Sequence, residues 1–81
     1  MRRHYVTLCM HGNTVVTYMR TESGIQVTFE QPKSRGFNTV VLDLDGAIIY
    51  NDGFESAETD YFQRFLRRNR DVIAEGAMED A

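Results

Sequence analysis

Residues 38–50 have the sequence NTVVLDLDGAIIY. Apolar runs lie on both sides of Asp45-Gly46, and Asp-Gly between two such runs is a strong signal for a β-hairpin, because Gly readily adopts the positive φ that a tight turn needs. This stretch therefore predicts two antiparallel strands, joined by a two-residue turn, with Leu42 opposite Ile49.

Three upstream segments are also rich in β-branched and aromatic residues, which favours strands: 4–10, 14–21 and 25–30. The turn between the second and third segments decides which side chains share a face. A two-residue loop at 23–24 would bring Arg20 opposite Val27, whereas a three-residue loop at 22–24 brings Met19 there. We therefore predict the three-residue loop.

The last third of the chain predicts one amphipathic helix that begins near Ser56 and ends at about Glu75, with Gly76 as its stop signal. Apolar residues recur in it at helical spacing: Tyr61, Phe62, Phe65, Leu66, Val72 and Ile73. The predicted fold is therefore α+β, an antiparallel β-meander of four to five strands with one C-terminal amphipathic helix packed on one face. Residues 1–76 would form a single domain, and 77–81 a frayed acidic tail.

Strand alternation assigns each residue to one of two sheet faces. The face toward the helix is predicted to carry Val6, Leu8, Met10, Val15, Met19, Ile25, Val27, Phe29, Val40, Leu42, Leu44 and Ile49. The opposite face would expose Tyr5, Val16, Tyr18, Val41, Ile48 and Tyr50. A helix about 10 Å wide does not cover a sheet about 24 Å across. We therefore expect the tyrosine-bearing face to bind protein, either a partner or a second copy in a homodimer.

The amino-acid composition indicates in which compartment the protein is located and which partners it can bind. The 81 residues include one cysteine, Cys9, so no intramolecular disulfide forms, and small secreted domains usually need such bonds. We therefore expect a cytoplasmic protein. No apolar run approaches the roughly 20 residues of a membrane span, so we expect no membrane partner. A chain of this size also has little room for a substrate pocket, so we predict no enzymatic activity and no cofactor.

The alternative function is that of a nucleic-acid-binding module. Four arginines of the predicted helix would contact the phosphates: Arg64, Arg67, Arg68 and Arg70. Helical angles spread them over the whole solvent side, with Asp60 and Asp71 at pairing distance (i, i+4) from two of them. The net charge of −3 also disfavours a strongly basic binder. Nucleic acid is therefore the less favoured partner.

Acidic residues cluster between 43 and 60, where they would contact either a cation or a basic partner: Asp43, Asp45, Asp52, Glu55, Glu58 and Asp60. Their spacing differs from an EF-hand loop, and turn and helix-start positions favour these residue types without any ligand. His4, Cys9 and His11 are too few for a closed zinc site, and His4 would point away from the other two. We therefore predict no metal site.

The segment 39–49 resembles the first motif of the haloacid dehalogenase-like phosphatases, an apolar strand followed by Asp-x-Asp-Gly. The resemblance implies Asp43 as nucleophile and Asp45 as acid/base, with magnesium between them. That family also uses a downstream lysine, and no lysine follows Gly46. Because turn chemistry explains each residue of the motif, we interpret it as a turn and predict no catalytic residues.

Overall fold

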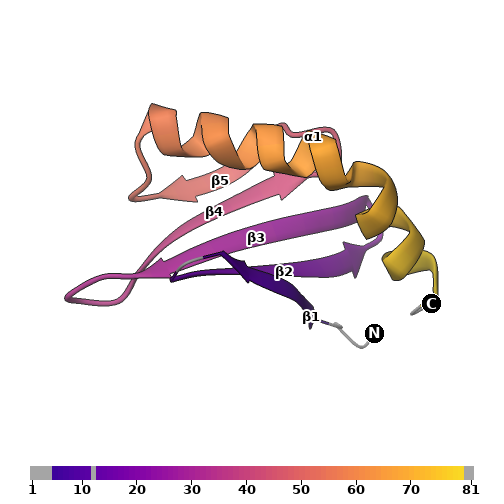
Figure 1. Cartoon of the computed structure of the whole chain (residues 1–81), viewed down its shortest axis with the longest axis horizontal. Coiled ribbons are helices and arrows are strands. Elements are labelled where there is room, and N and C mark those ends of the chain that lie inside the picture. The colour runs from indigo at the N-terminus through magenta and orange to yellow at the C-terminus, as the bar shows by residue number, and fades with distance from the viewer. Residues whose placement is uncertain (1–4, 12, 80–81) are drawn as a thin grey trace.

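The computed structural model describes residues 5–11 and 13–79, with side chains described for residues 13–76. Within these residues the chain forms five strands and then one helix: β1 (Tyr5–His11), β2 (Thr14–Thr21), β3 (Gly24–Pro32), β4 (Phe37–Asp43), β5 (Ile48–Asp52) and α1 (Ser56–Glu79). The strands lie in the sheet in chain order, each antiparallel to the next (Figure 1). The predicted α+β meander with a C-terminal helix is confirmed.

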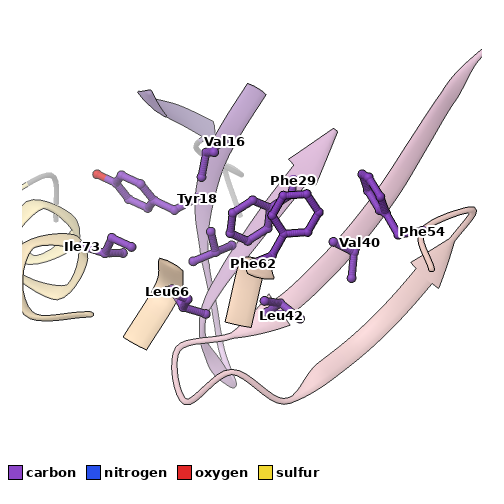
Figure 2. Close-up of a cluster of buried hydrophobic side chains, with 10 residues drawn as sticks. Val16, Tyr18, Phe29, Val40, Leu42, Phe54, Phe62, Leu66 and Ile73 are labelled. Atoms are coloured by element: carbon purple, nitrogen blue, oxygen red, sulfur yellow. The ribbon is translucent and has the colours of Figure 1, made fainter. Parts of the chain in front are cut away.

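Helix α1 runs along one face of the sheet and packs most closely on β2 and β3 (Figure 1). The side chains between the two layers form the core: Val16, Tyr18, Val27, Phe29, Val40, Leu42, Phe54, Phe62, Leu66 and Ile73. The rings of Phe29 and Phe62 stack at its centre with centroids 4.5 Å apart, and Phe54 meets the edge of Phe62 at 4.9 Å (Figure 2). Each such side chain contributes about 1.5–3 kcal/mol by leaving water.

The β2–β3 turn differs from the predicted one. Thr21 pairs with Gly24, so the loop between them is Glu22-Ser23 alone. The Thr21 hydroxyl accepts a hydrogen bond from the Ser23 N–H (3.2 Å) and donates one to the Gly24 carbonyl (2.9 Å). This side chain closes a tight turn that neither of the two loops considered from the sequence would give.

The one-residue change in loop length reverses the two faces of β2, because successive side chains of a strand point to opposite sides. Val16 and Tyr18 lie under the helix, only 1% and 3% exposed, so their predicted place on the open face is wrong. Val15 and Met19, predicted for the core, alternate with them and lie on the opposite face. The predicted core positions in β3 and β4 are confirmed: Val27, Phe29, Val40 and Leu42.

Hydrogen bonds in both directions between Glu55 and Glu58 cap the first turn of the helix. The Glu55 carbonyl accepts hydrogen bonds from the Glu58 and Thr59 N–H groups, both at 3.0 Å. The Glu55 N–H in turn donates to Glu58 Oε1 at 3.1 Å. Glu55 is therefore the N-cap, and Ser56, the predicted cap, is the first helical residue. The carboxylate of Glu58 suits both roles, because the helix dipole favours negative charge in the first turn.

The helix does not end at Gly76. It continues to Glu79, so the predicted end at Glu75 is wrong, and three residues of the predicted tail belong to α1. Gly76 does not adopt the positive φ that ends many helices at glycine. Glycine within a helix costs only about 0.5–1 kcal/mol, which packing offsets. Residues 80–81 of the predicted frayed tail lie outside the described residues, and fraying stays a prediction.

Candidate interaction surface

β5 is an edge strand of the sheet and, within the described residues, pairs with β4 on one side only. Three consecutive apolar residues on it are exposed: Ile48 (45%), Ile49 (51%) and Tyr50 (54%). We call these three residues the β5 surface. An edge strand also displays backbone N–H and C=O groups to which another strand can bond. The β5 surface therefore combines apolar side chains with a row of directional hydrogen-bonding groups.

The turn that leads into β5 is a three-residue loop, Leu44-Asp45-Gly46. The Gly46 N–H donates to the Asp43 carbonyl at 3.0 Å, and the Asp43 N–H donates to the Ala47 carbonyl at 2.9 Å. Gly46 has a φ of 94°, the left-handed position that such loops need. The predicted two-residue Asp-Gly turn is therefore wrong by one residue.

A bulge follows this turn. Leu42 lies opposite Ile48 and Val41 opposite Tyr50, so Ile49 is the extra residue on the β5 side. The predicted Leu42–Ile49 pair is wrong for this reason, and Ile49 is exposed instead of buried. Bulges bend a strand and re-aim its side chains. Here the bulge allows two adjacent isoleucines to be exposed together.

The Asp43 carboxylate stabilises the same turn. Its Oδ1 accepts hydrogen bonds from the N–H groups of Asp45 and Ala47, both at 2.9 Å. Asp45 forms an ion pair with Arg70 at 3.3 Å, but both side chains are largely exposed, so this pair contributes little. The Asp-x-Asp-Gly segment thus has a structural use for each carboxylate. That arrangement supports the interpretation of the motif as a turn.

Helix α1 contacts the turn end of β5. Gln63 Nε2 donates to the Gly46 carbonyl at 2.8 Å. The guanidinium of Arg67 covers Gly46, with Nε 3.7 Å from the position that a Cβ would occupy there. Cationic groups of Arg67 and Arg70 therefore lie with the carboxylates of Asp43 and Asp45 at the turn end of β5. Its other end carries the exposed acidic residues Asp52 and Glu55.

The predicted protein-binding residues fall into four groups. Val41 and Tyr50 lie on the face opposite the helix, in one cross-strand row with Thr28 of β3 and Thr17 of β2. Ile48 lies on the edge strand opposite Leu42, a core residue, so it is on the helix side of the sheet and its predicted place on the open face is wrong. Val16 and Tyr18 belong to the core, as described above, and are not available to a partner. Tyr5 pairs with Met19 in the register, but its side chain lies outside the part of the chain described in that detail.

Two exposed apolar residues of the sheet were missed from the sequence, and Tyr61 and Val72 of the predicted apolar helix face are exposed as well. Ile49 was assigned to the core because the bulge was not foreseen. Phe37 opens β4 and is exposed, on the face opposite the helix by alternation from Val41. The alternation of side chains along β4 is the sequence signal from which this position of Phe37 could have been predicted. Phe37, Val41 and Tyr50 therefore give the β4–β5 side of the open face three apolar residues.

The four predicted arginines are all exposed but do not form one patch. Arg67 and Arg70 point toward the β4–β5 turn, as described above. Arg64 and Arg68 line a separate hollow of about 260 Å³. Its other lining residues are Tyr61, Phe65 and Asn69. The Asn69 amide donates to the Phe65 carbonyl of its own helix at 2.8 Å.

A second, larger hollow of about 510 Å³ lies between the β2–β3 and β4–β5 turns, next to Arg20, Glu22, Asp43 and Asp45. Among the described residues, no group of three or more His, Cys, Asp or Glu side chains is placed to hold a metal ion. His4 and the side chains of Cys9 and His11 lie outside that description. No helix found in the described ranges combines the length and apolar character needed to span a membrane.

Comparison with protein-family models, with curated proteins and with solved structures finds no match for this chain.

Proposed function

We propose that this protein is a small non-catalytic interaction protein that binds another protein chain through the β5 surface and the adjoining open face. One observation carries this proposal: three consecutive apolar residues are exposed on an edge strand. Proteins usually protect such edges with lysine, proline, a bulge or a covering segment. β5 contains neither lysine nor proline, and its bulge leaves all three apolar residues exposed.

The uneven cover of the sheet supports the proposal. Helix α1 makes its closest approach to β2 and β3, and within the described residues the outer edge of β5 pairs with no other strand. On the face opposite the helix, Val41 and Tyr50 stand next to each other in the row that continues into two threonines. Contact with a partner chain would bury these groups at the β5 side of the sheet. We propose a reducing compartment, the cytoplasm, for this binding, because the chain has a single cysteine.

Site-specific photo-crosslinking tests the proposal. A photoreactive phenylalanine analogue is introduced at Ile49 in one variant and at Val72 in another. Val72 is an equally apolar, 67% exposed residue on α1 and serves as the matched control. We expect a discrete crosslinked product from position 49 in living cells, with this chain or with one other protein, and none from position 72. Equal products from both positions, or none from 49, would contradict the proposal.

The second candidate function is nucleic-acid binding, favoured by the hollow beside Tyr61 and Phe65. Its two arginines, Arg64 and Arg68, would contact phosphates while the neighbouring rings offer stacking surface. The test is fluorescence anisotropy of a single-stranded oligonucleotide at low and high salt. Binding that falls steeply with salt and is lost in Arg64→Ala/Arg68→Ala, but not in Arg70→Ala, would support this function. Absence of binding at low salt excludes it.

A further inference from the structure

We infer that the hollow beside Arg64 and Arg68 selects, within a single-stranded nucleic acid, a base that carries an amino group, as cytosine does. This inference rests on the second candidate function and names the ligand in it. It depends on one side chain, Asn69, whose amide presents a hydrogen-bond acceptor at the hollow.

The described residues that line the hollow all belong to one flank of α1. They are spaced three and four positions apart, which brings side chains to the same side of a helix: Tyr61, Arg64, Phe65, Arg68 and Asn69. The hollow has a volume of about 260 Å³. This is below the roughly 300–1,000 Å³ of sites for drug-sized ligands, so the hollow suits one planar base rather than a larger molecule.

The two arginines of the hollow have no carboxylate partner within the described residues. The ion pair found there joins Arg70 to Asp45 and involves neither Arg64 nor Arg68. Asp60 has the (i, i+4) spacing from Arg64 but does not pair with it. The described lining contains no acidic residue either. Both guanidinium groups are therefore able to bind the phosphates on either side of a base.

Asn69 is an unusual residue for its place on this flank. It lies four residues after Phe65 and three before Val72, in the middle of a long helix. Asparagine is a poor helix former because its side chain competes for backbone hydrogen bonds. Here Nδ2 donates to the Phe65 carbonyl at 2.8 Å. Only the NH₂ of an amide donates, so this bond fixes the side chain and leaves Oδ1 as an acceptor.

An acceptor held in this way favours a base that donates. Among the described residues, no group donates to Oδ1 of Asn69. Cytosine carries an amino group at position 4, whereas thymine and uracil carry a carbonyl oxygen there, which would face Oδ1 as a second acceptor. Phosphate contacts hold any base equally. The amide is therefore the group of the hollow that distinguishes cytosine from uracil, whose rings are otherwise alike in size.

Fluorescence anisotropy with three labelled oligodeoxynucleotides of equal length, at low salt and neutral pH, tests the inference. One contains only cytosine, one only uracil, and one only 2-pyrimidinone, which is cytosine without its amino group. We expect the native chain to bind the cytosine oligonucleotide about three- to tenfold more tightly than the other two, the effect of one hydrogen bond. Equal affinities for all three would overturn the inference.

Two substitutions at Asn69 link any preference to the amide. Asn69→Leu removes the acceptor and keeps a side chain of similar size, whereas Asn69→Ala leaves a smaller one. Both variants should bind cytosine as weakly as the native chain binds 2-pyrimidinone, with unchanged affinity for 2-pyrimidinone. A change in the shape of the hollow would instead affect all three ligands alike. A preference retained in either variant contradicts the role of Asn69. Both replacements are better helix formers, so α1 should persist, which circular dichroism checks.

The outcomes separate this inference from the function on which it rests. Binding that is lost in Arg64→Ala/Arg68→Ala but is equal for the three oligonucleotides supports nucleic-acid binding and rejects the selection of an amino base. Absence of binding to all three at low salt rejects both. Neither result bears on the β5 surface, which crosslinking from Ile49 tests separately.

Discussion

The hydroxyl of Tyr18 donates a hydrogen bond to the carbonyl oxygen of Gly76 at 3.3 Å. The two residues are 58 positions apart in the sequence, and the bond joins the middle of β2 to the last turns of α1. The ring of Tyr18 lies beneath the helix near Ile73, with its oxygen at the edge of the core (Figure 2). The side chain therefore supplies apolar packing and one polar tether at the same place.

Two substitutions at Tyr18 should separate these contributions. Tyr18→Phe retains the ring and loses the hydroxyl, so we expect a loss of about 0.5–1.5 kcal/mol in the free energy of unfolding. Tyr18→Glu places a charge in the core and should leave little folded protein. Urea denaturation followed by circular dichroism measures both. A folded, stable Tyr18→Glu variant would show that Tyr18 is not part of the core.

Leu66 is the fully buried helix residue, 0% exposed at the centre of the interface between α1 and the sheet. Leu66→Ala should reduce the free energy of unfolding by about 2–5 kcal/mol through lost burial and the cavity left behind. Val72→Ala on the exposed side of the same helix should change it by less than about 0.5 kcal/mol. Thermal denaturation of the two variants beside the native chain tests the contrast. Similar losses in both would contradict the packing described for α1.

Asp43 should act as a turn residue. Asp43→Ala removes the acceptor for the N–H groups of Asp45 and Ala47 and should cost about 1–3 kcal/mol. Asp43→Asn keeps an oxygen in the same position and should cost less. We also expect no magnesium-dependent hydrolysis of p-nitrophenyl phosphate by the native chain. Hydrolysis that disappears in Asp43→Asn, a conservative change for the turn, would favour the phosphatase interpretation instead.

Gly53 has a φ of 102°, and a Cβ there would collide with the side-chain amide of Asn38. Gly53→Ala should therefore be destabilising by more than the roughly 1–2 kcal/mol that left-handed backbone alone costs. Gly24 has a φ of 129° with open space around it, so Gly24→Ala serves as the control for backbone strain. Adding Asn38→Ala to Gly53→Ala should relieve part of the loss. A double-mutant cycle by thermal denaturation measures this coupling.

Most of the element types were predictable because their segments carry a clear period. Alternation in β3 and β4 places Val27, Phe29 and Leu42 in the core without knowledge of the partners. β2 lacks this clarity, because apolar residues occur on both of its faces. Its orientation therefore depends on the turn, and a bond from the Thr21 hydroxyl, invisible as a sequence period, sets the loop length.

The candidate surface was harder to predict than the fold. Val41 and Tyr50 were placed correctly because the pairing of Val41 with Tyr50 survives the change in the turn. Ile49 was misplaced because the Asp43 carboxylate holds an additional loop residue and a bulge follows it. The hydrophobic pattern alone does not show where a bulge adds a residue to a strand. The hydrogen bonds from the Asp43 side chain to the backbone thus contribute to the exposure of Ile49 beside Ile48.

The arrangement of strands in chain order also has a consequence for how the protein folds. Every strand pairing joins neighbours along the chain, so each hairpin closes a short loop at a small entropic cost. Docking of α1 on β2 and β3 is different, since it brings together segments from opposite ends of the chain. The meander should therefore assemble quickly and locally, while helix docking closes the longest loop. Stopped-flow kinetics should show Leu66→Ala accelerating unfolding much more than it slows folding.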